Sequence, residues 1–224
     1  EHARAEKLNY HYSGKCRRLD AATVERYLGE GRPFTVRFRV PEGATTFEDM
    51  VHGVTTFQNE TIGDFIIARA DGSPVYLLGV AVDDSDMGIT LVMRGDDHLS
   101  NTPKQIMLMR ALGNPVPRFA HLPQVLGADL KKLSKRHGAA SVMEYRKMGI
   151  LPGALVNFLA LLGWNPGDDR EKMPLDELIE AFSIEQISKK SGVFDMQKLE
   201  WLNGLYLAET PAEELFELAA PLLV

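Results

Sequence analysis

The sequence predicts an α/β protein with a parallel sheet between a region of short antiparallel strands and an all-helical region. Three observations predict this: short alternating segments fill the first third, a strand–helix–strand succession spans residues 89–126, and helical periodicity fills the remainder. A strand–helix–strand succession is typical of parallel sheets, which bind ligands at the carboxyl ends of their strands. With 224 residues, the chain is long enough for more than one packed domain.

The first predicted domain covers residues 1–73. Val36, Phe38 and Val40 alternate with polar residues, as in a half-buried strand. Asp71-Gly72 has the composition of a turn that needs positive φ. We expect a helix over residues 4–12 and strands over 35–40, 53–58 and 64–70. Antiparallel strands dominate, so we predict a small mixed α+β domain.

The second predicted domain covers residues 74–126. Its expected elements are a buried strand over 89–93, a helix over 101–112 and a second strand over 121–126. Pro103 suits the first turn of that helix, and Gly113 suits the position after its end.

The third predicted domain covers residues 127–224 and is helical beyond Gly138. Apolar residues recur there at i, i+3, i+4 and i+7, and further helices are expected from Asp195 and after Pro211. Proline opens two of the helices, at positions 152 and 174. We expect both tryptophans, Trp164 and Trp201, to lie in the core.

Composition excludes several classes of protein. The formal charge of −6 argues against a general DNA-binding or RNA-coating protein, so any nucleic acid must meet a local basic patch. No apolar run approaches the roughly 18 residues of a membrane span, and we expect a cytoplasmic location with no membrane partner. Cys16 is the single cysteine and the six histidines are scattered, so we expect no structural zinc.

The most informative segment is the basic loop Lys131–Gly138. Cations at the carboxyl end of a strand are placed to hold phosphate, although charge alone is more typical of a solvated loop. Its sequence at residues 132–136, KLSKR, resembles the KMSKS signature of class I aminoacyl-tRNA synthetases in the form usual for the glutamyl branch.

Other segments extend this resemblance along the chain. Residues 94–105, RGDDHLSNTPKQ, are similar to the RGEDHxxNTxxQ stretch of glutamyl-tRNA synthetases, with Asp96 in place of the usual Glu. Residues 64–84 resemble the family's strand, Asp-Gly turn and Pro-x-Tyr, although Val75 and Leu77 depart from the usual wording. The resemblance implies the second half of a class I synthetase Rossmann-type nucleotide-binding fold, part of an inserted mixed α+β acceptor-end-binding domain and a helical stem-contact domain.

The resemblance also implies roles for named residues. Lys132 and Lys135 are expected to be catalytic, because fixed cations stabilise charge that develops on the α-phosphate of ATP. ATP, accompanied by Mg²⁺, is expected to contact these two lysines together with Leu133, Ser134, Arg136 and Asp97. The loop is expected to close over ATP, and Gly138 is a candidate hinge.

Glutamate recognition is expected to involve Arg94 and Tyr76. A guanidinium pairs with a carboxylate through two hydrogen bonds, and a tyrosine hydroxyl can share that carboxylate. The alternatives are an ion pair of Arg94 with Asp96 or Asp97 and a core position for Tyr76.

The implied function is a glutamate–tRNA ligase that forms glutamyl-adenylate and transfers glutamate to the 3′ end of tRNA(Glu). Contacts to tRNA are expected from the first domain and from helical-region lysines at 147, 189 and 190. The sequence contains no HxGH motif, and both ends look cut, so we expect an internal fragment that lacks activity by itself. The alternatives are a non-catalytic tRNA-binding paralogue, a glutamyl-queuosine tRNA synthetase and a glutaminyl relative. Oligomeric state and discrimination between tRNAs stay open.

Overall fold

The computed structural model describes residues 12–133 and 141–220. The chain divides into two compact units. The first comprises Glu1–Asp49, Gly53–Val92 and His98–Phe119, and the second comprises Met50–His52, Met93–Asp97 and Ala120–Val224. The predicted first helix, over residues 4–12, lies almost entirely outside the described residues. The predicted boundaries after residues 73 and 126 remain predictions.

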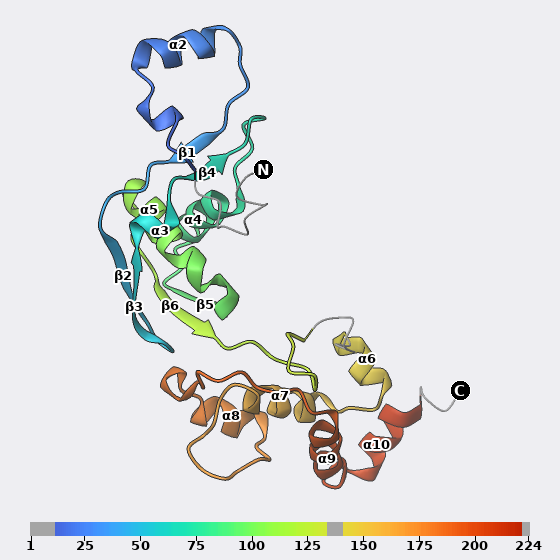
Figure 1. The fold of residues 1–224 in the computed structure, drawn as a ribbon. Coiled ribbons are helices and arrows are strands. Elements are labelled where there is room, and N and C mark those ends of the chain that lie inside the picture. The colour runs from blue at the N-terminus through green and yellow to red at the C-terminus, as the bar shows by residue number, and fades with distance from the viewer. Residues whose placement is uncertain (1–11, 134–140, 221–224) are drawn as a thin grey trace. The chain divides into compact units, whose positions relative to one another are not determined.

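A four-stranded mixed sheet has the order β3-β2-β6-β5 (Figure 1). Its strands are β2 (Ala44–Asp49), β3 (Gly53–Gln58), β5 (Leu91–Gly95) and β6 (Arg118–Leu122). Strands β2 and β3 form an antiparallel hairpin, and β2 pairs with β6 in parallel. The sequence placed residues 53–58 in a separate antiparallel region, whereas this hairpin extends the sheet that contains β5 and β6.

Helix α5 (Thr102–Ala111) connects β5 to β6 and confirms the predicted strand–helix–strand succession. It follows the short 3-10 helix η2 (Asp96–Asn101), begins with Pro103 in its first turn and ends before Gly113, whose φ is +75°. Its buried residues leave hardly any solvated face on the first two turns. Leu108 and Met109 form a cluster with Ala81 of α4 (Tyr76–Asp86), against which side chains of the smaller sheet also pack.

That smaller sheet consists of β1 (Val36–Phe38) and β4 (Phe65–Ala68), paired antiparallel. Helix α2 (Ala21–Gly29) precedes β1 and buries none of its residues. Asp20 caps α2 by accepting hydrogen bonds from the Thr23 backbone N–H at 2.8 Å and the Thr23 hydroxyl at 2.9 Å. Both bonds favour the carboxylate, so they hold the pKa of Asp20 below its usual value. The short helices η1 (Cys16–Arg18) and α3 (Asn59–Ile62) complete this unit.

The part of the second unit over residues 141–220 is helical, as predicted. Its helices are α6 (Val142–Lys147), α7 (Pro152–Leu161), α8 (Leu175–Ala181), η4 (Ile184–Gln186), α9 (Met196–Leu207) and α10 (Ala212–Ala219). Apolar residues of α6, α7 and α9 form one core around Leu155, Phe158, Leu199 and Leu202. Trp164 is buried, but the core prediction for Trp201 is wrong, because this side chain is 48% exposed. Trp201 lies beside the stripe that Leu199 and Leu202 bury, about 100° around the helix from Leu202.

The predicted second strand of the parallel pair was misplaced. We expected it over residues 121–126, whereas β6 ends at Leu122. Pro123 follows directly and has no N–H to donate to a neighbouring strand. None of the helices in the described ranges is long and apolar enough to cross a bilayer.

Candidate functional site

Two polar side chains mark the carboxyl ends of adjacent strands. Arg94 is near the end of β5, and its Nε donates to Nε2 of His121 near the end of β6, at 3.2 Å. At the other end of this pair, the N–H of Arg118 donates to the carbonyl of Thr90 at 3.0 Å. Thr90 precedes Arg94 in the sequence, and its partner Arg118 precedes His121, so β5 and β6 run in the same direction. Arg94 therefore lies at the sheet edge where parallel strands present ligands.

The chain turns back sharply after Arg94, and this turn positions Asp97. A Cβ atom on Gly95 would lie only 2.6 Å from Oδ1 of Asp97, so any other residue there would displace the Asp97 carboxylate. Oδ2 of the same carboxylate accepts from Nζ of Lys132 at 2.6 Å. The RGDDH segment and the first lysine of KLSKR, 35 residues apart, therefore meet at one ion pair.

The start of the KLSKR loop is the second arm of a tight hairpin. The N–H of Leu133 donates to the carbonyl of Val125, and Lys132 forms a bridge with Leu126. The turn between the arms contains Leu130 at φ +60°, the one non-glycine residue of the described ranges with a positive φ. A left-handed conformation costs such a residue about 1–2 kcal/mol, so this turn is strained next to Lys132.

This hairpin is attached to the helical region through its first arm. The N–H of Leu126 donates to the carbonyl of Gly192 at 2.8 Å, and the N–H of Phe194 donates to the carbonyl of Leu126 at 2.8 Å. Gly192 itself lies against the backbone of Leu162, so closely that a Cβ would overlap its carbonyl oxygen. The position of Lys132 therefore depends on backbone packing beyond residue 160.

Tyr76 is the first residue of α4 and is 56% exposed, so the core alternative for this tyrosine is wrong. Its ring lies 5.8 Å from the ring of His98, at an interplanar angle of 53°. His98 shares a hydrogen bond with the side-chain amide of Asn101 at 3.3 Å. Tyr76 thus lies at the surface beside a polar residue of this segment.

Of the predicted KLSKR residues, Lys132 and Leu133 lie within the described range. Ser134, Lys135, Arg136 and the candidate hinge Gly138 lie outside it. Within residues 12–133 and 141–220, no three His, Cys, Asp or Glu side chains gather where they could hold a metal ion.

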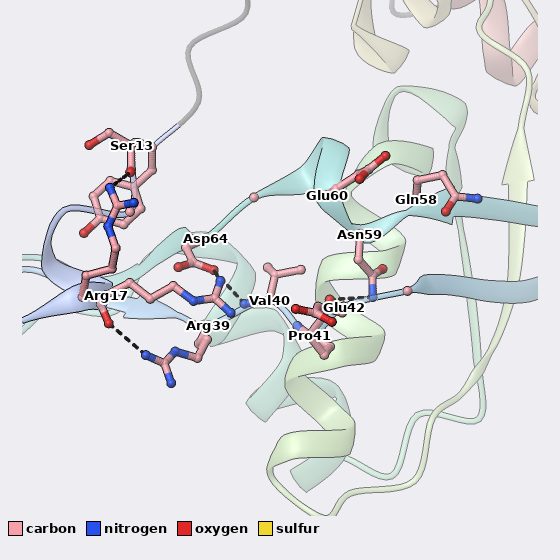
Figure 2. Close-up of a pocket in the computed structure, with 15 residues that line it drawn as sticks. Ser13, Arg17, Arg39, Val40, Pro41, Glu42, Gln58, Asn59, Glu60 and Asp64 are labelled. Atoms are coloured by element: carbon pink, nitrogen blue, oxygen red, sulfur yellow. Dashed lines mark hydrogen bonds and ion pairs between the residues drawn. The ribbon is translucent and has the colours of Figure 1, made fainter.

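A polar cavity of about 930 Å³ lies in the first unit, beside the loop between β1 and β2 (Figure 2). Arg17, Arg18 and Arg39 line it together with Asp64. Asp64 accepts from the guanidinium of Arg17 and from the backbone N–H of Val40, both at 2.9 Å, and its side chain is nearly buried. This carboxylate therefore fixes one basic side chain at the wall of the cavity.

Sequence reasoning missed this basic surface. Residues 12–40 contain seven basic and three acidic residues, although the whole chain has a formal charge of −6. A local charge count would have found this region. Aromatic rings accompany the arginines: the guanidinium carbons of Arg26 and Arg32 lie 4.8 and 4.1 Å from the ring centre of Tyr27. Arginine with aromatic side chains is the combination that binds unpaired nucleotides.

Comparison with known proteins gives a consistent result. Glutamate–tRNA ligases of Carboxydothermus hydrogenoformans and Oleidesulfovibrio alaskensis are 51% and 52% identical to the chain, over 94% and 100% of its length. The chain covers 44% and 47% of those two relatives, so it spans about half of their length. The crystal structure of the glutamate–tRNA synthetase from Elizabethkingia anophelis matches 96% of the chain with a TM-score of 0.86 at 29% identity, and 49% of that structure is covered.

A family model extends over most of the sequence. The model for the catalytic domain of the class I tRNA synthetases specific for E and Q matches residues 1–201. The match includes both the RGDDH segment and the KLSKR loop. The chain therefore belongs to the class I tRNA synthetase family, in the branch of the glutamyl and glutaminyl enzymes.

Proposed function

We propose that the protein is a glutamate–tRNA ligase and that this chain contributes the glutamate-binding arginine and the KLSKR half of its ATP site. The observation that carries the proposal is the 2.6 Å ion pair between Lys132 and Asp97. It brings together the two segments of the chain that resemble the glutamyl enzymes most specifically. Two relatives that are 51% and 52% identical to the chain are named for the same activity.

In the proposed first step, the α-carboxylate of glutamate attacks the α-phosphorus of ATP. A carbon–oxygen–phosphorus anhydride bond forms, the bond to the β-phosphate breaks and pyrophosphate leaves. Lys132 and Lys135 act on the phosphate oxygens, where negative charge increases in the transition state. Mg²⁺ would enter with the ATP phosphates and not through a protein cage.

Asp97 has two successive partners in this proposal. Without ATP it accepts from Lys132, and both side chains are more than a third exposed, at 40% and 59%. An exposed ion pair is worth only about 0.2–1 kcal/mol, so ATP can replace it at little cost. Lys132 then moves to the phosphates, and the Asp97 carboxylate becomes available to the adenosine hydroxyls.

Arg94 pairs with the side-chain carboxylate of glutamate, and Tyr76 shares that carboxylate through its hydroxyl. A guanidinium has donors only, so it matches a carboxylate but meets the NH₂ group of glutamine with a second donor. This pairing favours glutamate over glutamine, which is the distinction between the two branches of the family.

In the proposed second step, a hydroxyl of the terminal ribose of tRNA(Glu) attacks the glutamyl carbonyl. An ester bond forms and AMP leaves. The basic and aromatic surface of residues 12–40 is the proposed contact for the acceptor end of the tRNA, since its net positive charge suits phosphate and its rings suit unpaired bases.

The test is amino-acid-dependent exchange of pyrophosphate into ATP by the enzyme that contains this chain. The proposal predicts exchange with glutamate and background exchange with glutamine and aspartate, in the presence of tRNA. Preference for glutamine would assign the protein to the other branch. No exchange with any amino acid, although the protein retards tRNA in a binding assay, would support the non-catalytic paralogue.

A further inference from the structure

A buried histidine that the proposed mechanism does not use lies directly beside Arg94. His121 is fully buried, with 0% of its surface exposed, and its Nε2 accepts the Nε–H of Arg94 at 3.2 Å. A guanidinium has no acceptor atom, so the imidazole nitrogen must be the acceptor. The ring is therefore neutral at Nε2 and has its proton on Nδ1.

We infer that His121 is the positioning residue for Arg94, and that it sets the direction in which the guanidinium meets a substrate carboxylate. The inference rests on the proposed role of Arg94 and extends it to a residue of the neighbouring strand.

The geometry of the guanidinium explains the effect. Its five N–H groups lie in one plane, and a bond on Nε prevents that plane from turning about the bond between Nε and Cδ. The two terminal nitrogens are then held as a pair with a fixed orientation. A bidentate contact with a carboxylate needs both donors aligned at once, so a fixed plane lowers the entropy lost when glutamate binds.

The surroundings make this restraint rigid. His121 is the fourth residue of β6 and Arg94 the fourth of β5, so both side chains start from hydrogen-bonded strands. Full burial prevents water from replacing the imidazole as acceptor. A misplacement of about 1 Å in a positioning group lowers activity by on the order of 100-fold.

Two conservative variants separate positioning from packing. In His121→Gln the amide oxygen lies at about the place of Nε2 and keeps an acceptor for Arg94. In His121→Asn the shorter amide occupies the place of Nδ1, so its oxygen cannot reach the Nε–H of Arg94. Both variants are polar, uncharged and smaller than histidine, so a loss of packing affects both.

The assay is glutamate-dependent pyrophosphate exchange in the enzyme that contains this chain. We expect His121→Asn to raise KM for glutamate about 10- to 100-fold while KM for ATP changes less than about twofold. We expect His121→Gln to stay within about threefold of the parent protein. Equal effects of both variants on both KM values, or an unchanged KM for glutamate in His121→Asn, would overturn the inference.

A second measurement does not depend on activity. In the ¹⁵N-labelled chain, the Nε–H of Arg94, assigned by its loss in Arg94→Lys, should exchange slowly with water in the parent and in His121→Gln, and rapidly in His121→Asn. Fast exchange of this proton in the parent overturns the positioning role of His121, whichever amino acid the enzyme activates. Slow exchange in the parent, together with absent glutamate activation, would instead refute the proposed function and leave the hydrogen bond in place.

Discussion

The helical unit contains a buried amide whose removal has a calculable cost. Asn157 on α7 is fully buried, and its Oδ1 accepts from the N–H of Met173 at 2.8 Å and from the hydroxyl of Tyr206 at 3.0 Å. Its Nδ2 donates to the carbonyl of Glu171 at 3.1 Å. The amide thus holds the segment before α8 against α7 and α9.

The substitution Asn157→Leu keeps the number of side-chain heavy atoms and the branch at Cγ, and it removes both hydrogen-bonding groups. The N–H of Met173 is left buried without this acceptor, which costs about 1–3 kcal/mol, whereas the partly buried carbonyl of Glu171 can bond to water. We expect a net loss of about 2–3 kcal/mol in the free energy of unfolding. With a urea m-value of about 2 kcal/mol per molar, the midpoint falls by about 1 M.

Tryptophan fluorescence during urea unfolding is the assay. Trp164 and Trp201 are the two tryptophans of the chain and both lie in the second unit, so the signal follows that unit alone. Gln197→Leu is the matched control, since it removes an exposed amide on α9 and should change stability by less than about 0.5 kcal/mol. A midpoint for Asn157→Leu that equals the control value would show that the buried amide does not stabilise this unit.

Four further predictions concern the site. If Arg94 pairs with the substrate carboxylate as proposed, Arg94→Ala removes a charge pair worth about 2–5 kcal/mol, so kcat/KM for glutamate in pyrophosphate exchange should fall at least about 30-fold; unchanged exchange would mean that another residue recognises glutamate. Lys135→Ala should lower the activation rate and leave glutamate binding nearly unchanged, and an effect confined to KM for glutamate would remove Lys135 from the phosphates. Gly192→Ala should lower the urea midpoint of the tryptophan signal, because its Cβ would overlap the carbonyl of Leu162, and an unchanged midpoint would show that the backbone can yield there. Leu130→Gly should raise stability by about 0.5–1 kcal/mol in the same assay, since glycine adopts positive φ without strain, and a decrease would show that the leucine side chain stabilises the turn.

Sequence pattern predicted those elements whose signals are local. Pro103 and Gly113 delimited α5 to within about one residue, and the helix predicted from Asp195 begins with that residue as its cap. The Asp195 side chain accepts hydrogen bonds from the backbone N–H groups of Gln197 and Lys198, and as the N-cap it fixes where the helix begins. Helix caps, prolines and glycines act on the neighbouring backbone, so the helix boundaries that they set can be predicted from a single sequence.

Elements that depend on distant partners were missed. Strand β2 (Ala44–Asp49) has no clear apolar alternation, because one buried face consists of Thr45, Phe47 and Asp49. Its pairing with β3 and β6 determines the strand, and that pairing is invisible in a local window. Helix α4 contains Gly79 and two β-branched residues, Val80 and Val82, which weaken its helical signal. Packing against α5 stabilises its conformation.

The candidate site shows the same division. Resemblance supplied Arg94, Asp97, Tyr76 and Lys132 as separate residues, but not the ion pair between Lys132 and Asp97 or the hydrogen bond from Arg94 to His121. These contacts join residues 35 and 27 positions apart, so they exist only once the parallel strands and the hairpin have formed. Only the three-dimensional arrangement reveals which residue orients which.

We propose that the enzyme containing this chain attaches glutamate to the 3′ end of tRNA, and charging of tRNA with labelled glutamate measures this attachment. We expect ATP-dependent incorporation of label, and ribonuclease digestion should release the label as an ester of the terminal adenosine. Labelled glutamine should give no incorporation. Label that stays on an internal nucleotide, or a requirement for glutamine in place of glutamate, would show that the protein has a different activity.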